Sequence, residues 1–202
     1  MKLWLVLLIL AVSLPLIALG CSSDGGVGTG ISRILGQALA PETTADVTKD
    51  VPLPGATVIL LEYDEAGNLQ GATVGTTDAD GNFEVDVQAQ AVVVIQVAGM
   101  TNDGDANVEG LFNPNQPMIA KDLDPATSIA CGAGVGAIGD GSITQEQLDE
   151  TRVQNLEDAA RDYIAANPDF DFYDPAQVGV AVDAVRVATD NGAHPAAPGA
   201  FT

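Results

Sequence analysis

The sequence predicts a mainly β protein with additional α-helix, in which a small antiparallel β-sandwich precedes a C-terminal helical region. Between residues 31 and 99, short apolar or alternating segments are separated by turn residues, and no helical pattern intervenes. After residue 124, apolar residues recur at helical spacing behind N-cap residues. The chain has 202 residues, of which 47% are hydrophobic, so it can form one or two modest domains and is not disordered throughout.

The strands are predicted from turn residues and from the period of the apolar positions. The first strand is followed by a polar loop that extends through Asp50. Asp80 and Gly81 predict a tight hairpin, because both tolerate the positive φ that primed turns require. Apolar and polar residues alternate from 83 to 88, which indicates a half-buried strand. The predicted strands are residues 31–39, 56–63, 69–77, 83–88 and 91–97.

Each predicted helix begins with a capping signature. An Asp-Pro pair supplies an N-cap followed by proline at the first helical position, where its missing N–H costs nothing. The clearest helix is predicted over residues 144–166, with a capping box at its start. The expected helix starts are Asp124–Pro125, Thr144 with Gln147, and Asp174–Pro175.

The first residues have the pattern of a secretory signal. Lys2 precedes an apolar run over residues 3–19, and the segment Ile-Ala-Leu-Gly-Cys ends at Cys21. This segment resembles the lipobox of bacterial lipoproteins, which implies cleavage before Cys21 and acylation of its thiol. Ser22, with no Asp at that position, resembles an outer-membrane sorting signal if the cell is Gram-negative. The alternatives are an ordinary signal peptide and an uncleaved membrane helix, for which the run is short.

Two motifs in the predicted sandwich carry a second resemblance. Residues 52–58 read PLPGATV, residues 75–83 read GTTDADGNF, and a valine-rich strand follows. Together they resemble the carboxypeptidase regulatory-like domain, a transthyretin-like β-sandwich related to the collagen-adhesin B-type repeat. The resemblance implies an accessory module and does not imply an enzyme. With His194 as the single histidine, the chain cannot form the two-histidine zinc site of a peptidase.

The charge of the chain restricts its partners. Seven Lys and Arg against 28 Asp and Glu give a net charge of −21, which excludes a nucleic-acid binder that needs a basic surface. Cleavage before Cys21 would remove Lys2, so the side-chain charge would become 6 − 28 = −22. Cys131 lies in an apolar segment and is expected to be a buried, inert thiol.

One acidic segment is a candidate calcium site. Asp103, Asp105, Asn107 and Glu109 alternate through a segment predicted to be a polar loop, and Ca²⁺ takes six to eight oxygen ligands. The alternative is a solvated loop, because 28 acids in 202 residues produce such spacings by chance.

The main aromatic cluster of the mature chain has two interpretations. A sugar site usually presents a large aromatic face, and Trp4, the single tryptophan, lies in the predicted signal peptide. Phe170, Phe172 and Tyr173 are close together in sequence. They are expected to fill the space between two helices, and a glycan contact is the alternative.

These features divide the chain and suggest its role. The predicted divisions are a signal peptide (1–20), a flexible tether (21–30), the carboxypeptidase regulatory-like sandwich (31–99), an acidic loop and connector (100–123), a helical region (124–192) and a loose tail (193–202).

The leading hypothesis is a non-catalytic, lipid-anchored protein of the bacterial cell envelope, which binds or scaffolds a protein or glycan partner. The alternatives are a calcium-stabilised adhesion module and an accessory subunit of an envelope enzyme or transporter.

Overall fold

The protein combines β-sheets with a group of helices, which confirms the predicted β-plus-α class. The structure, a computed structural model, describes residues 30–44, 47–63, 68–88 and 92–202. The strands are β1 (Ile31–Gln37), β2 (Leu39–Thr44), β3 (Val47–Pro52), β4 (Thr57–Tyr63), β5 (Leu69–Thr76), β6 (Asn82–Gln88), β7 (Val93–Thr101), β8 (Gly104–Phe112) and β9 (Met118–Ala120). The helices are α1 (Pro125–Gly139), the 3₁₀ turn η1 (Gln145–Gln147), α2 (Glu150–Ala166) and α3 (Pro175–Ala188).

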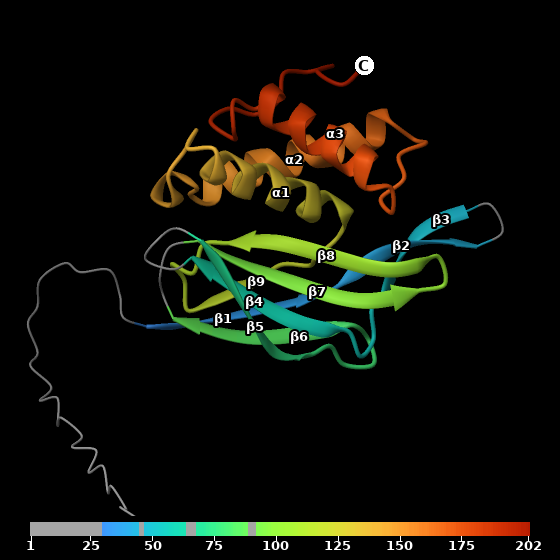
Figure 1. Ribbon diagram of the computed structural model, residues 1–202, viewed down its shortest axis with the longest axis vertical. Coiled ribbons are helices and arrows are strands. Elements are labelled where there is room, and N and C mark those ends of the chain that lie inside the picture. Colours follow the sequence, from blue (N-terminus) through green and yellow to red (C-terminus); the bar gives the residue numbers. More distant parts are fainter. Residues whose placement is uncertain (1–29, 45–46, 64–67, 89–91) are drawn as a thin grey trace, which may run out of the picture.

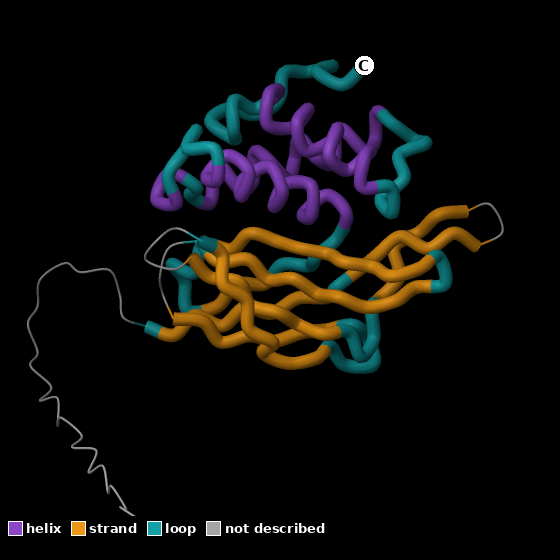
Figure 2. The backbone as a smooth tube through the Cα atoms, in the orientation of Figure 1, coloured by secondary structure: helices purple, strands orange, loops and turns teal. Residues whose placement is uncertain are grey.

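The described strands form three sheets. One has the order β5-β4-β7-β8 and is antiparallel throughout, and another has the order β6-β1-β9, in which β9 runs parallel to β1. The pair β2–β3 forms a two-stranded arm that extends past the ends of β7 and β8 (Figure 1). The three α-helices lie together on one side of the strands (Figure 2).

Two apolar clusters hold these layers together. In the first, Ile34 and Val85 of the three-stranded sheet pack with Val58 and Ile95 of the four-stranded sheet. The second cluster joins the opposite face of the four-stranded sheet, for example at Leu111, to all three helices. The helical region therefore packs on the β-structure, and each of these faces is removed from water.

Residues 39–44 and 47–52 form the two strands of the arm and not the expected polar loop. Thr43 and Thr48 face each other across β2 and β3, with their hydroxyl oxygens 3.0 Å apart. Ala40 is fully buried, so the base of the arm belongs to the core. The threonines and valines of this segment favour a strand, and its many polar residues concealed that preference at the sequence level.

The turn at residues 78–82 connects two sheets, so the hairpin prediction is wrong. Gly81 has the expected positive φ of 78°, and the Asp78 carboxylate accepts hydrogen bonds from the N–H groups of Asp80 and Asn82. However, β5 pairs with β4 and β6 pairs with β1. The turn chemistry is local and was predictable, whereas strand pairing depends on contacts far away in the chain.

The segment predicted as an acidic loop and connector is mostly β-structure. β8 pairs with β7 along its whole length, and β9 adds a short strand to the other sheet. Ala106 and Val108 are buried between exposed or half-buried polar neighbours, which is the alternation of a strand. The β-region therefore extends well beyond residue 99.

The predicted N-caps of the first and last helices are confirmed. The carboxylates of Asp124 and Asp174 each accept a hydrogen bond from a backbone N–H of the first helical turn. The middle helix starts later than predicted, because Thr144 begins only the single turn η1 and Asp149 caps α2. The predicted loose tail is also wrong, since Phe201 packs edge-on against Tyr163 with ring centres 5.4 Å apart.

A buried ion pair connects the β-structure to the helices. Lys121, which follows β9, lies with its Nζ 2.6 Å from Oε1 of Glu157 on α2. The same Nζ donates to the carbonyl of Leu111 and lies 4.7 Å from the ring centre of Phe112. The Glu157 side chain is only 6% exposed, and its charge is compensated by Lys121 and, at 3.7 Å, by Arg161.

The N-terminal predictions concern residues that are not described. Residues 1–20, Cys21 and residues 22–29 of the tether lie outside the described ranges. Among the described helices, none combines the length and apolar composition that a bilayer-spanning helix requires.

Candidate functional site

A cleft of about 450 Å³ opens where the arm, the β7–β8 turn and the α2–α3 loop meet. We call it the acidic–aromatic cleft. It is lined by Pro41, Thr43, Thr48, Asp103, Pro125, Pro168, Asp169, Phe170, Asp171, Phe172 and Tyr173. Three of these residues carry carboxylates, three carry aromatic rings, three are prolines, and none is basic. The volume is within the range of small-ligand sites.

The α2–α3 loop has a defined shape because the flanking residues end one helix and begin the next. Asn167 caps α2, and its Nδ2 donates to the carbonyl of Tyr163 at 2.8 Å. Pro168 cannot continue the helix, since it has no N–H to donate. Asp171 then accepts a hydrogen bond from the N–H of Tyr173, and Asp174 starts α3. The loop thus holds its aromatic residues in fixed positions.

Tyr173 connects this loop to the β-structure through hydrogen bonds. Its hydroxyl donates to the carbonyl oxygen of Pro41 at 2.5 Å and lies 2.9 Å from Oγ1 of Thr101. Burial raises the pKa of Tyr173, the hydrogen bond with Thr101 opposes this shift, and the nearby Asp103 and Glu42 carboxylates raise the pKa further. The tyrosine is therefore kept protonated as a donor.

Two carboxylates join the arm to the β7–β8 turn. Oδ2 of Asp103 accepts a hydrogen bond from the N–H of Thr43 at 2.5 Å, and Oε2 of Glu42 accepts from the N–H of Asn102 at 3.1 Å. These reciprocal contacts fix the arm beside the turn and place the Asp103 carboxylate on the cleft wall.

The acidic charge around the cleft is incompletely compensated. On the arm, partial burial and then repulsion by Asp124 raise the pKa of Asp50. Asp169 forms no ion pair with a described residue, and neither does Asp171. The region therefore has a negative potential, which favours positively charged groups.

The aromatic residues of the cleft pack against two different apolar clusters. Phe170 packs edge-on against Tyr163 with ring centres 6.0 Å apart, and Phe172 lies at 71° to Tyr173. Phe170 belongs to the helix-side cluster, whereas Phe172 and Tyr173 pack on the cluster between the sheets. Only Phe170 therefore packs among the helices, as expected, while Phe172 and Tyr173 pack on the β-structure, and all three residues remain partly exposed along the cleft.

The structure does not bring the four candidate calcium residues together. Asp103 lies in the β7–β8 turn, while Asp105, Asn107 and Glu109 follow one another along a single face of β8. Alternate residues of a strand are about 6.8 Å apart, so Asp105 and Glu109 are separated by roughly twice that distance. The predicted loop that would wrap an ion is absent here, and the calcium site remains a prediction.

Glu109 is directed to other partners. Its Oε1 accepts hydrogen bonds from Nε2 of Gln96 at 2.7 Å and from Nδ2 of Asn107 at 3.3 Å. Its carboxylate also lies beside Cys131, a free and buried thiol. Burial raises the pKa of Cys131 well above its usual value, and Glu109 acts in the same direction. This thiol therefore stays protonated, which is the inert state that the sequence predicted.

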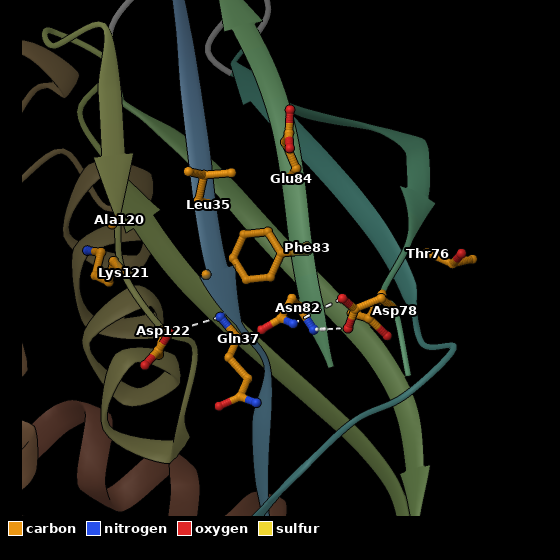
Figure 3. Close-up of a pocket in the computed structure, with 12 residues that line it drawn as sticks. Leu35, Gln37, Thr76, Asp78, Asn82, Phe83, Glu84, Ala120, Lys121 and Asp122 are labelled. Atoms are coloured by element: carbon orange, nitrogen blue, oxygen red, sulfur yellow. Dashed lines mark hydrogen bonds between the residues drawn. The ribbon is translucent and has the colours of Figure 1, made fainter. Parts of the chain in front are cut away.

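A larger surface groove, about 940 Å³, is lined by residues of β1 and β6, by the end of β5 and the turn that follows it, and by residues 120–122 (Figure 3). Phe83 and Leu35 lie in it beside polar residues, but these polar groups bind each other. Asp122 accepts from the N–H of Gln37 at 2.9 Å, and Nδ2 of Asn82 donates to Asp78 at 3.0 Å. The groove therefore offers fewer unengaged charged groups than the acidic–aromatic cleft.

Comparisons with known proteins were made for the whole chain. No family model matches the sequence, and no curated protein matches it. Among solved structures, a crystal structure of a 9R-lipoxygenase from Cyanothece PCC8801 matches with 12% identity and a TM-score of 0.32. The match covers 73% of this chain and only 27% of the lipoxygenase chain. At this TM-score the likeness does not establish a shared fold.

The sequence indicates part of this site but not how it is assembled. Asp103 and the aromatic cluster stand out separately, for different reasons. The contribution of Pro41, Thr43 and Thr48 is not predictable, because the polar composition of the arm is typical of a loop. No local signal places these residues beside the α2–α3 loop, which lies more than a hundred positions further along the chain.

Proposed function

We propose that the protein is a lipid-anchored, non-catalytic binding protein of the bacterial cell envelope, with the acidic–aromatic cleft as its binding site. The observation that carries this proposal is the construction of the cleft. Its walls come from the arm, the β7–β8 turn and the α2–α3 loop, so a bound group would contact the arm, the four-stranded sheet and the helical region together. A site at such a junction can bind a ligand without moving its walls.

The arrangement of the two larger sheets supports a sandwich of the carboxypeptidase regulatory-like kind. Their inward faces share one apolar cluster. Residues 52–58 form a turn that leads into β4, and residues 75–83 form the connection from β5 to β6. Both motifs of the proposed resemblance therefore lie at places where the chain enters a core strand.

The roles of the candidate chemical groups favour binding over catalysis. The Cys131 thiol is enclosed and protonated, so it is a poor nucleophile. Asp103 and Asp171 both accept backbone hydrogen bonds at the cleft, which gives them a positioning role. The cleft thus presents fixed charges and ring faces.

The anchor is proposed from the sequence around Cys21. A mature chain with a side-chain charge of −22 would be repelled by anionic lipid headgroups, so attachment would depend on the acyl chains. Several chains contribute about 0.8 kcal/mol per buried methylene, which is enough to hold a protein at a bilayer. In a Gram-negative cell, Ser22 favours the outer membrane.

Membrane fractionation of a Cys21→Ser variant tests the anchor. The wild-type chain should sediment with membranes and incorporate labelled palmitate, and Cys21→Ser should lose both properties. Cys131→Ser is the matched control, because that cysteine is buried in the folded domain. A Cys21→Ser protein that still sediments with membranes and still takes up palmitate would show that the lipoprotein proposal is wrong.

A further inference from the structure

The acidic–aromatic cleft combines ring faces with carboxylates that lack basic partners. Phe170, Phe172 and Tyr173 line one side, and their rings are only partly buried. Asp103 of the β7–β8 turn and Asp171 of the α2–α3 loop also line the cleft. A group that enters the cleft therefore meets π-faces and negative charge at the same time.

We propose that this cleft binds a lysine side chain of a protein partner, which carries a protonated amine on an apolar stem. The inference rests on the proposed binding function and names its ligand class. Aromatic faces attract cations through their quadrupole, and carboxylates add Coulomb attraction. The three prolines and the rings can contact the apolar part of such a ligand.

The positions of the carboxylates favour an organic cation over a small metal ion. A metal ion needs several oxygens at 2.0 to 2.6 Å from one point. Within the described residues, no group of three or more Asp, Glu, His or Cys side chains is close enough together to hold a metal. An ammonium group on a stem can instead use carboxylates that are spread along the walls of a 450 Å³ cleft.

The pre-formed walls make the site selective for shape as well as charge. Tyr173 is held by Pro41 and Thr101, and Asp103 is held by Thr43. These contacts join groups of the protein to one another and fix both segments, so binding would not need to order the arm or the loop. Ligands with the charge but no apolar part should bind less tightly than ligands with both.

The direct test uses the full chain in nonionic detergent and two matched pairs of small probes. Nα-acetyl-lysine amide is compared with Nα-acetyl-norleucine amide, which lacks the ammonium, and glucosamine is compared with the neutral N-acetylglucosamine. Binding is followed by shifts of the backbone amide signals in NMR spectra. Nα-acetyl-lysine amide should shift the signals of Thr43 and of residues 169–173, and Nα-acetyl-norleucine amide should not. The glucosamine pair distinguishes the proposed lysine side chain from an amino sugar of a glycan.

Charge-removing variants locate the interaction. Asp103→Asn and Asp171→Asn keep an oxygen that can accept the existing backbone hydrogen bonds, so their folds should be maintained, as circular dichroism can verify. Each should weaken binding of the charged probe up to about fivefold, the usual range for an exposed charge pair, and added salt should have a similar effect. Asp183→Asn is the control, because this exposed carboxylate lies on α3 outside the cleft.

Three results would overturn the inference. They are equal binding of Nα-acetyl-lysine amide and Nα-acetyl-norleucine amide, signal shifts that avoid the cleft, and an equal loss of affinity in Asp183→Asn. The last result would mean that the net charge alone attracts the amine. Each of these outcomes leaves the membrane anchor intact, so the ligand class and the anchoring proposal can fail separately.

Discussion

The hydroxyl oxygen of Tyr173 lies 2.5 Å from the carbonyl oxygen of Pro41, a residue 132 positions earlier in the chain. This hydrogen bond connects the α2–α3 loop to the arm, and both of its residues line the cleft. A second hydrogen bond joins the same arm to the β7–β8 turn, because the Asp103 carboxylate accepts from the N–H of Thr43. The arm is therefore part of the folded body, although it extends from it.

Removing the Tyr173 hydroxyl should loosen the arm. Tyr173→Phe keeps the ring and deletes the hydrogen bond to Pro41, so the free energy of unfolding should fall by about 0.5–1.5 kcal/mol. Urea denaturation measures this change, and amide exchange at Thr43 should become faster. Tyr163→Phe is the control, since no hydrogen bond to its hydroxyl is found among the described residues. Equal effects of the two variants would refute a specific role for Tyr173.

Breaking the buried ion pair should have a larger effect. Glu157→Leu leaves the Lys121 ammonium without its carboxylate, and the expected cost is about 3 kcal/mol in the free energy of unfolding. The double variant Lys121→Met with Glu157→Leu should recover most of this loss, because no unpaired charge remains. Arg161→Gln, at a half-exposed partner of Glu157, should cost less than about 1 kcal/mol. Failure of the double variant to recover stability would mean that the pair is not the source of the effect.

Substitution by alanine should change the stability very differently at two glycines of the sheets. A Cβ at Gly36 of β1 would lie 2.0 Å from the backbone oxygen of Lys121, whereas a Cβ at Gly75 of β5 meets nothing within 4 Å. Gly36→Ala should therefore destabilise by about 1–3 kcal/mol or more through overpacking, with Gly75→Ala close to neutral. Thermal unfolding of both variants checks this, and similar melting temperatures would contradict the contact between β1 and the segment after β9.

Acid should weaken one contact between the end of α1 and α3. Hydrogen bonds from Ser142 and then Arg186 lower the pKa of Asp140 from 3.8 to about 2. Because the folded-state pKa is depressed, the stabilisation is present above pH 3.8 and is lost as the pH falls towards 2. Arg186→Gln should thus lose less stability than wild type over that pH interval. The measurement is the urea midpoint at each pH, with Asp183→Asn as control, and an unchanged pH profile in Arg186→Gln would count against the pair.

Calcium removal provides a test of the remaining metal hypothesis. The positions of Asp105, Asn107 and Glu109 along one strand lead us to expect the same melting temperature with Ca²⁺ and with EDTA. Scanning calorimetry under both conditions gives the answer. A clear stabilisation by Ca²⁺ that disappears in Asp103→Asn would restore the calcium-stabilised adhesion module as an explanation.

Features that depend on neighbouring residues could be predicted from the sequence. Asp124 and Asp174 cap their helices because an Asp side chain reaches the N–H groups two or three residues ahead. Gly81 adopts positive φ for an equally local reason. The alternation from Phe83 to Val87 also identified the buried face of β6 correctly.

Features that depend on distant contacts could not be predicted. Nothing near residue 80 shows that β6 will pair with β1, and nothing near Pro41 shows that Tyr173 will bind it. β8 is an intermediate case: its buried Ala106 and Val108 gave a strand pattern, but the acidic residues between them suggested an ion-binding loop. In β8 the period of the apolar residues therefore predicts the structure better than the spacing of the acidic ones.

The direction of β1 separates the start of the folded region from the cleft. The strand begins at Ile31 at one end of the molecule, whereas the arm and the β7–β8 turn lie at the other (Figure 1). A chain held at Cys21 would have nine tether residues, which extend to roughly 30 Å. The point of attachment and the cleft would then lie at different ends of the molecule, so a tethered chain would leave the cleft accessible to a partner.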